Sequence, residues 1–156
     1  MFYKKKITGF KCNNCQQWIS LKGFIGTHYR NHCPFCLFST HVDDKKSGDR
    51  HSSCHGLMEP VGLTFKKEGT DKYGKVRQGE LMLIHHCQVC DEFSINRIAA
   101  DDEPLMVLKI FEDSQKLPEE LKKEIDFQSI YLLTDKDEKE IKTQLFGKKF
   151  DNTIKT

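Results

Sequence analysis

The chain has 156 residues, of which 31% are charged and 37% hydrophobic, and its formal net charge is +2. This length suits one soluble domain, or a small domain with an appended segment. No segment has the roughly 20 consecutive apolar residues that a bilayer-spanning helix needs. The first ten residues contain lysines but no long apolar run, which argues against a signal peptide and predicts a cytoplasmic protein.

Residues 1–42 combine cations with aromatic rings and contain no acidic residue. Cations that follow phosphates, beside rings that stack on unpaired bases, are the two ingredients of single-stranded nucleic-acid binding. Lysines near a four-thiolate metal site can also neutralise it, and rings in a small metal domain can fill its core. Trp18 is the ring that we most expect to be buried. The cations are Lys4, Lys5, Lys6, Lys11, Lys22 and Arg30, and the rings are Phe2, Tyr3, Phe10, Trp18, Phe24 and Tyr29.

Seven cysteines form three Cys-x-x-Cys pairs and one single cysteine. An odd number of thiols in a reducing interior favours metal ligands over disulfides. Cys12 and Cys15 are followed, after seventeen residues, by Cys33 and Cys36, which is the spacing of a four-thiolate zinc ribbon. Four buried thiols without a metal are the alternative, but so short a segment has little else from which to build a core. Iron also suits four thiolates.

The segments between the cysteines predict β structure and turns. Residues 16–21 form a predicted strand, and residues 43–50, which are polar and turn-forming, form a predicted loop. Further strands are predicted at 62–65, 81–84 and 93–98, with an extended hairpin tip over 68–75. A ribbon hairpin therefore accompanies each half of the metal-binding region.

The thiols of Cys54, Cys87 and Cys90 need a fourth ligand to close a second tetrahedral site. In a chain with seven histidines, imidazole is the natural donor. Spacing slightly favours His51, because two residues separate it from Cys54, whereas His41 follows the first site closely along the chain. His55 is a poorer candidate because it is adjacent to Cys54 and would be strained, and His85 and His86 are poorer because the strand that enters a knuckle usually points its side chains past the metal. We expect two zinc ions in all.

The chain changes character after Pro104, because residues 105–156 contain no cysteine, histidine or tryptophan. We therefore divide it into a metal-binding module, residues 1–104, and a C-terminal extension, residues 105–156. A strand is predicted over 106–111, a helix over 118–125, and a second helix from Thr134 or Asp135 to Leu145. Short helices are marginally stable alone, so we expect them to dock on the module.

The predicted fold is thus a small, metal-stabilised α+β fold. It comprises two zinc-ribbon-like β-hairpin halves, followed by a short strand and C-terminal helices. We expect the metal sites to replace most of the hydrophobic core that so polar a chain lacks.

The run Arg30-Asn31-His32-Cys33-Pro34 resembles the five-letter signature of the RNHCP-domain family of bacterial zinc-ribbon-like proteins. The resemblance covers roughly residues 9–103, in which many separate anchors occur in one order. It implies a small zinc-ribbon-like domain without an established enzymatic activity, and it favours His41 over His51 as the fourth ligand. Further anchors are Phe35 to Leu37, Ser39, His41 to Asp43, Gly48 to Arg50, Cys54, Gly56, Met58 to Pro60, His85, Cys87, Cys90, Arg97 to Ala99, and Asp101 with Asp102.

Two enzymatic patterns are incomplete in this chain. Zinc deaminases place a glutamate two residues after the first ligand, but Gly56 follows Cys54 at that offset and Asp43 follows His41. Thioredoxin-like exchange needs a Cys-x-x-Cys pair at a strand-to-helix turn, whereas these pairs lie between predicted strands. We therefore expect no enzymatic activity.

These features predict a cytoplasmic zinc protein that binds RNA, within a ribosomal or other translation-linked assembly. Metal binding weakens overall attraction to RNA: four thiolates with a dication carry minus two, and three thiolates with a neutral imidazole carry minus one. The formal charge of +2 then becomes about minus one. The alternative is a protein-interaction adaptor in which zinc is purely structural and the C-terminal helices bind a protein partner.

Overall fold

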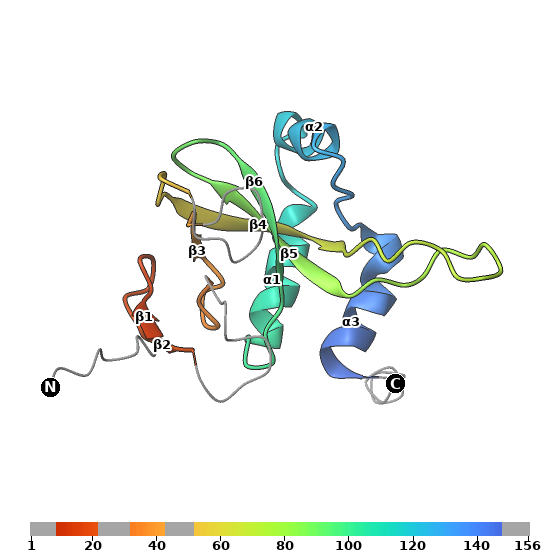
Figure 1. The fold of residues 1–156 in the computed structure, drawn as a ribbon, viewed down its shortest axis with the longest axis horizontal. Coiled ribbons are helices and arrows are strands. Elements are labelled where there is room, and N and C mark those ends of the chain that lie inside the picture. The colour runs from red at the N-terminus through yellow and green to blue at the C-terminus, as the bar shows by residue number, and fades with distance from the viewer. Residues whose placement is uncertain (1–8, 22–31, 43–51, 148–156) are drawn as a thin grey trace, which may run out of the picture.

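The computed structural model describes residues 9–21, 32–42 and 52–147. A two-stranded sheet comes first, formed by β1 (Gly9–Lys11) and β2 (Trp18–Ser20). A four-stranded sheet follows in the order β3-β4-β5-β6. Its strands are β3 (Ser39–Thr40), β4 (Leu57–Phe65), β5 (Leu81–Cys87) and β6 (Phe93–Arg97). The described chain is completed by α1 (Pro104–Ser114), α2 (Glu119–Phe127), a 3-10 turn η1 (Asp135–Asp137) and α3 (Glu138–Phe146). The mixture of sheets and helices confirms the α+β class (Figure 1).

The long antiparallel pair of β4 and β5 organises the larger sheet. Its register runs from Met58 opposite Cys87 to Phe65 opposite Leu81, with an irregularity between Pro60 and Gly62. Proline cannot donate to a strand ladder, which explains why the irregularity occurs there. Because β5 ends at Cys87, this pairing carries a cysteine to one end of the sheet and leaves the loop 66–80 at the other end.

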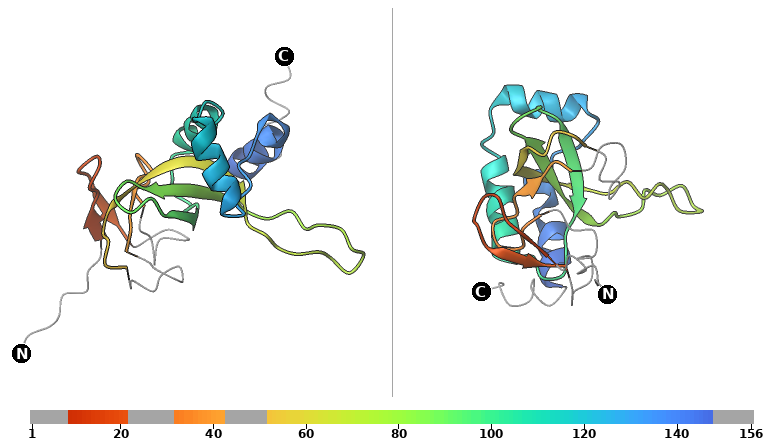
Figure 2. Two further views of the ribbon diagram at one scale, coloured as in Figure 1. Left: turned by 90° about the horizontal axis from the view of Figure 1, so that it is seen from above. Right: turned by 60° about the vertical axis from the view of Figure 1, so that its left-hand side comes forward.

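The helices pack on this sheet rather than extending from it. Leu83 of β5, Val107 of α1 and Ile141 of α3 belong to one cluster, and each is fully buried. A second cluster joins Ile84 of β5 to Ile125 of α2. Figure 2 shows the helices gathered beside the sheet, with the loop 66–80 projecting away from them. Docking of the helices is therefore confirmed, whereas the division at residue 104 stays a prediction.

One predicted element is wrong, because residues 106–111 belong to helix α1 and not to a strand. A short apolar run does not by itself distinguish a buried strand from a buried helix. The helix starts at Pro104, which suits the first turn, and the side chain of Glu103 accepts a hydrogen bond from the Leu105 amide at 3.3 Å. Val107, Ile110 and Phe111 then fall on one face, at helical spacing, and are buried.

The other two predicted helices are present with shifted ends. Residues 118–125 were expected to be helical, and α2 begins one residue later and ends at Phe127. Thr134 caps the short turn η1 through a reciprocal capping box with Asp137, and α3 follows directly. Among the described residues, no helix has the length and apolar character that crossing a bilayer requires.

Helix α3 should contribute strongly to stability. Replacing Ile141 with alanine should lower the free energy of unfolding of the metal-loaded protein by about 2–5 kcal/mol, because the side chain is fully buried in the core. Leu105→Ala is the matched control, since Leu105 is 67% exposed and its loss should cost less than about 0.5 kcal/mol. Urea denaturation measures both. Equal stability of Ile141→Ala and the wild type would show that α3 does not dock.

Candidate metal centres

The three Cys-x-x-Cys pairs adopt the same local structure. In each, the amide of the first cysteine donates to the carbonyl five residues later, and the amide four residues later donates back to that cysteine's carbonyl. The first bond joins Cys12 to Gln17 at 2.8 Å, Cys33 to Phe38 at 2.9 Å and Cys87 to Glu92 at 2.8 Å. The second bond joins Gln16 to Cys12 at 3.0 Å, Leu37 to Cys33 at 2.9 Å and Asp91 to Cys87 at 3.1 Å. The residue after the second cysteine is left-handed in every case: Gln16 at φ 67°, Leu37 at φ 64° and Asp91 at φ 63°. Each pair is therefore a tight knuckle, as its spacing predicts.

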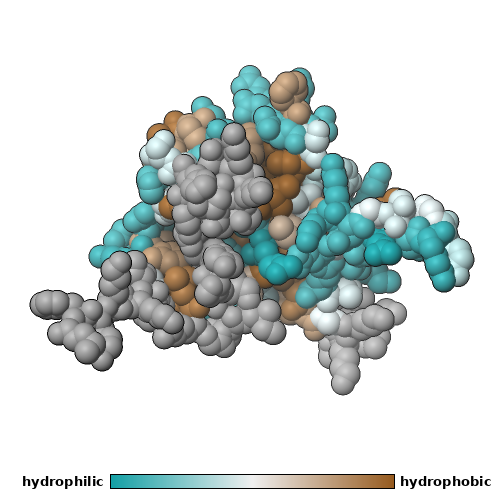
Figure 3. Space-filling view, in the orientation of Figure 1, coloured by the Kyte–Doolittle hydropathy of each residue, from teal (hydrophilic) through white to brown (hydrophobic). Residues whose placement is uncertain are grey.

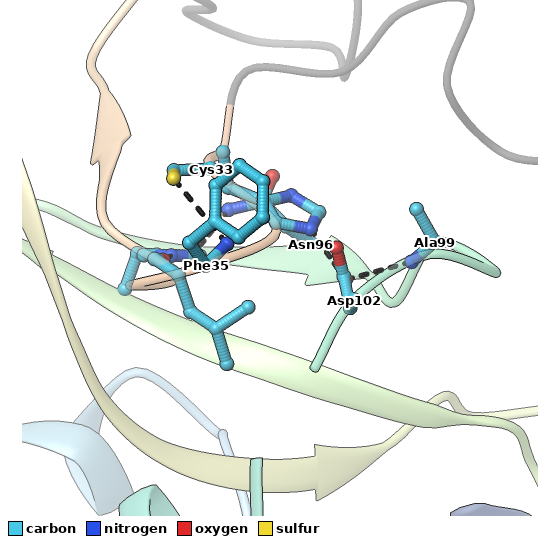
Figure 4. A network of polar contacts seen from close by, with 8 residues as sticks. Cys33, Phe35, Asn96, Ala99 and Asp102 are labelled. Atoms are coloured by element: carbon cyan, nitrogen blue, oxygen red, sulfur yellow. Dashed lines mark hydrogen bonds and ion pairs between the residues drawn. The ribbon is translucent and has the colours of Figure 1, made fainter. Parts of the chain in front are cut away.

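The first site unites the knuckles of Cys12 and Cys33. The Cys12 and Cys36 sulfurs lie 3.6 Å apart, as do those of Cys15 and Cys33. All four donor atoms lie within 4.8 Å of one another. Backbone amides also approach the sulfurs: the amide of Asn14 donates to Cys12 Sγ at 3.4 Å, and that of Phe35 to Cys33 Sγ at 3.4 Å (Figure 4). Such bonds favour thiolates.

The second site gathers its four donors from three places in the chain. His41 follows β3, Cys54 precedes β4, and Cys87 and Cys90 form the knuckle at the end of β5. The Cys54 and Cys87 sulfurs are 3.7 Å apart, and Cys90 Sγ is 3.3 Å from His41 Nδ1. The structure therefore brings His41 to the three remaining thiols. His51, the alternative that spacing favoured, lies outside the described residues.

Both donor sets have the geometry and chemistry of a metal site. A zinc–sulfur bond of about 2.3 Å implies sulfur–sulfur edges of about 3.8 Å in a tetrahedron, close to the 3.6 and 3.7 Å found here. A disulfide would need about 2.05 Å, and all seven cysteines are thiols. The clusters can therefore hold metal ions, which would act as structural cross-links.

The thiols of the second site ionise unequally. Burial raises the pKa of Cys87, but the amides of Cys90 and Val89 and the side chains of Cys90 and His41 lower it to about 7. The pKa of Cys90 is raised to about 11, by burial and by its neighbours Cys87 and Cys54. Thiolates that share a site oppose one another, and a dication removes that opposition, so the donor set suits a divalent metal.

Contacts around the second site orient its ligands. The outer nitrogen of His41, Nε2, lies 3.2 Å from a carboxylate oxygen of Glu92, which leaves Nδ1 directed at the thiols. Carboxylates that bond the outer nitrogen of a ligating histidine fix its ring and tautomer. Gly56 lies against the cluster so closely that a methyl group there would meet Cys87 Sγ at 2.9 Å. A side chain at position 56 would therefore force the Val89 side chain or Cys87 Sγ to shift.

The two sites are neighbours joined by β3, which lies between Cys36 and His41. The side chain of Asn13, within the first knuckle, donates to Thr40 Oγ1 at 3.2 Å. His85, two residues before Cys87, is fully buried and its Nε2 donates to the carbonyl of Leu37 at 2.7 Å. Burial lowers the pKa of His85 to about 3, so it is neutral at physiological pH. This hydrogen bond therefore connects β5, the strand that leads to the second centre, to the residue that follows Cys36 of the first centre.

A second buried histidine ties the first centre to the start of α1. His32 Nε2 donates to a carboxylate oxygen of Asp102 at 2.6 Å, and the Ala99 amide donates to the same oxygen at 2.8 Å (Figure 4). The amide of Glu103 donates to the carbonyl of Pro34 at 3.0 Å. Sequence reasoning missed these supporting roles. The signal was available, because His32, His85 and Asp102 all belong to the family pattern, but only the tertiary structure pairs them.

The predicted RNA-binding residues are only partly described. Lys4, Lys5, Lys6, Lys22 and Arg30 lie outside the described residues, as do Phe2, Tyr3, Phe24 and Tyr29. Lys11 is exposed on β1. The expected burial of Trp18 is wrong, because its side chain is 64% exposed and Ile19 occupies the core position of β2 instead.

The RNHCP domain model matches residues 7–108, about two thirds of the sequence. The chain belongs to the RNHCP-domain family. The matched region contains both donor clusters and the first residues of α1, so the RNHCP domain includes the Asp102 contact as well as the ligands. No curated protein and no solved structure matches the chain.

The bond between His32 and Asp102 should stabilise the RNHCP domain measurably. Asp102→Ala should lower the free energy of unfolding by about 3 kcal/mol, since it leaves two buried donors, His32 Nε2 and the Ala99 amide, without their acceptor. Asp113→Ala, at an exposed position of α1, is the control and should have little effect. Urea unfolding of the metal-loaded variants tests this. Indistinguishable midpoints for the two variants would contradict it.

Proposed function

We propose that this RNHCP-domain protein is a non-enzymatic, cytoplasmic zinc protein that binds RNA within a ribosomal or other translation-linked assembly. The zinc assignment rests on the donor sets, one of four thiolates and one of three thiolates with an imidazole. Both are usual for structural zinc. Four protein ligands close each tetrahedron, whereas a catalytic zinc keeps one position open, and this supports a structural role.

The single observation that carries RNA binding is the position of Trp18. It faces Lys11 across the pair of β1 and β2, so the two side chains share one face of the first ribbon. The Trp18 ring also lies over Gly9, where a methyl group would come within 2.8 Å of two ring atoms. A ring supported on one side and exposed on the other is a platform for a stacked base, and the adjacent lysine suits a phosphate.

The distribution of charge also supports this proposal. Residues 1–100 contain 15 Lys and Arg and 9 Asp and Glu, a formal +6, whereas residues 101–156 contain 10 and 14, a formal −4. Even after the minus three that two occupied sites contribute, the first part remains at about +3. The attraction to a polyanion therefore belongs to the RNHCP domain, although the whole molecule is nearly neutral.

The zinc proposal predicts two ions per chain. Elemental analysis of freshly purified, reduced protein should find two zinc. Cys15→Ser and Cys54→Ser should each hold about one, because each removes a ligand from a different cluster. If the analysis instead finds one zinc and one iron, the Cys15 cluster holds iron, the other metal that suits four thiolates. Absence of metal from the wild type would overturn the proposal.

The RNA proposal predicts a specific role for Trp18. Trp18→Ala should weaken the binding of a labelled single-stranded RNA about tenfold, because stacking of one base contributes about 1–3 kcal/mol. Tyr131→Ala is the matched control, since Tyr131 is an exposed ring in the connection between α2 and η1. Fluorescence anisotropy at several salt concentrations measures both affinities. A wild-type protein without salt-dependent affinity for the RNA would refute RNA binding.

One observation favours the alternative, a protein-interaction adaptor. Phe127, the last residue of α2, is 85% exposed although the same helix buries Ile125 in the core. Reversing the charges of Lys4, Lys5, Lys6 and Arg30 separates the two functions. RNA binding should be lost if the first proposal holds, and recovery of a protein partner should be unchanged if the adaptor proposal holds.

A further inference from the structure

The loop between β4 and β5, residues 66–80, forms an arm that stands away from the domain. Figures 1 and 2 show it projecting beyond the sheet, on the far side from β1 and β2. From Lys66 to Gln78 every residue except Asp71 is exposed. At about 3.3 Å per residue the arm can reach roughly 20 Å from the sheet. Its side chains therefore contribute little to the core and are available to a partner.

The arm is nevertheless organised by its own hydrogen bonds. The Arg77 amide donates to the Gly69 carbonyl at 2.9 Å, and the Asp71 amide donates to the Lys75 carbonyl at 2.8 Å. One carboxylate oxygen of Asp71 accepts from the amides of Tyr73 and Lys75 at 2.8 and 3.0 Å. Gly74 provides the left-handed residue of the turn at φ 78°. Little conformational entropy is therefore lost when the tip binds.

The tip is cationic and aromatic. Residues 69–78 contain Lys72, Lys75 and Arg77 against one acid, Asp71, whose carboxylate is already bonded within the turn. Among the described residues, neither Lys75 nor Arg77 forms an ion pair with a carboxylate. Tyr73 is 77% exposed, and the Lys72 ammonium lies 5.1 Å from the centre of its ring. Figure 3 shows the arm as a hydrophilic projection, unlike the apolar surface beneath α2.

We propose that this arm is a second RNA-binding element, in which Lys72, Lys75 and Arg77 contact phosphates and Tyr73 stacks on an unpaired base. The inference rests on the proposed function and adds a surface that shares no residue with the first ribbon. It combines the same two ingredients as Lys11 and Trp18, cations and an exposed ring, at the opposite end of the domain. An RNA that touches both surfaces spans the whole domain, and its affinity includes both contributions.

Phosphate contacts and stacking leave different signatures in a salt titration. Each phosphate contact to a single strand contributes about 0.7 to the slope of log K against log salt concentration, whereas stacking contributes almost nothing. Three contacts at the tip therefore correspond to a slope change of about 2. Loss of Tyr73 should weaken binding at every salt concentration without changing that slope.

The experiment uses the full, metal-loaded chain and a labelled, mixed-sequence single-stranded RNA of about 30 nucleotides, longer than the ~4–16 nucleotides that one small domain covers. The arm variant is Lys72→Gln with Lys75→Gln and Arg77→Gln, and a second variant is Tyr73→Ala. The control neutralises three exposed lysines, one in the turn between α1 and α2, one in α2 and one in α3: Lys116→Gln, Lys123→Gln and Lys139→Gln. Equal thermal stability and metal content show that each variant is folded.

We expect the arm variant to lose about 10- to 100-fold in affinity at ~0.1 M salt, with a slope smaller by about 2. The control should match the wild type. If the arm variant binds like the wild type while Trp18→Ala weakens binding, the arm proposal is overturned and the proposed function stands. If the control loses as much affinity as the arm variant, the arm proposal is also overturned, because the loss would then reflect the net charge of the protein and not the position of the cations. If the wild type shows no salt-dependent binding, both fail.

Discussion

The knuckle at Cys33–Cys36 connects the first ribbon to the larger sheet and to helix α1. Its thiols meet those of the first ribbon, where Cys15 and Cys33 sulfurs are 3.6 Å apart. Its Pro34 carbonyl accepts a hydrogen bond from the amide of Glu103, the residue before α1. The carbonyl of Leu37, the residue after the knuckle, accepts a hydrogen bond from His85 of β5. Leu37 itself is left-handed and fully buried in the main core. A displaced knuckle would therefore disturb the ribbon, the sheet and the first helix together.

Hydrophobic burial is distributed unevenly between the first ribbon and the larger sheet. Among the described residues of the first ribbon, the buried cluster consists of Cys12, Ile19 and Cys33, so a metal that cross-links the thiols would add stability that so small a cluster cannot supply. The larger sheet has an ordinary core with the helices, in which Leu63, Leu83 and Leu133 are fully buried. The larger sheet does not fit the expectation that metal replaces most of the core, and for the ribbon that expectation stays a prediction. Apolar side chains of the helices beyond residue 104 complete the hydrophobic core of the larger sheet.

The small interior of the first ribbon leaves side chains on its surface that the proposed function uses. A ribbon held by metal needs few side chains in its interior, which leaves Lys11 and Trp18 on its surface. The arm likewise needs no packing, because Asp71 and its own backbone hold the turn. Residues 101–156, which contain the helices, carry a formal charge of −4. The domain therefore presents cations and exposed rings at two ends.

The sequence by itself determined the local chemistry. Two-residue gaps specify the knuckles, so Cys12 and Cys15 could be paired with Cys33 and Cys36, and the family pattern pointed to His41, which the structure places beside Cys54. The tertiary structure alone decided how distant segments meet: Asp102 bonds His32 across seventy residues, and residues 106–111 are helical because their apolar side chains fill the face of the sheet. It also decided that Trp18 is exposed. Knuckles depend on neighbours in the chain, whereas burial depends on which surfaces fold together, and periodicity in a short segment carries no information about that.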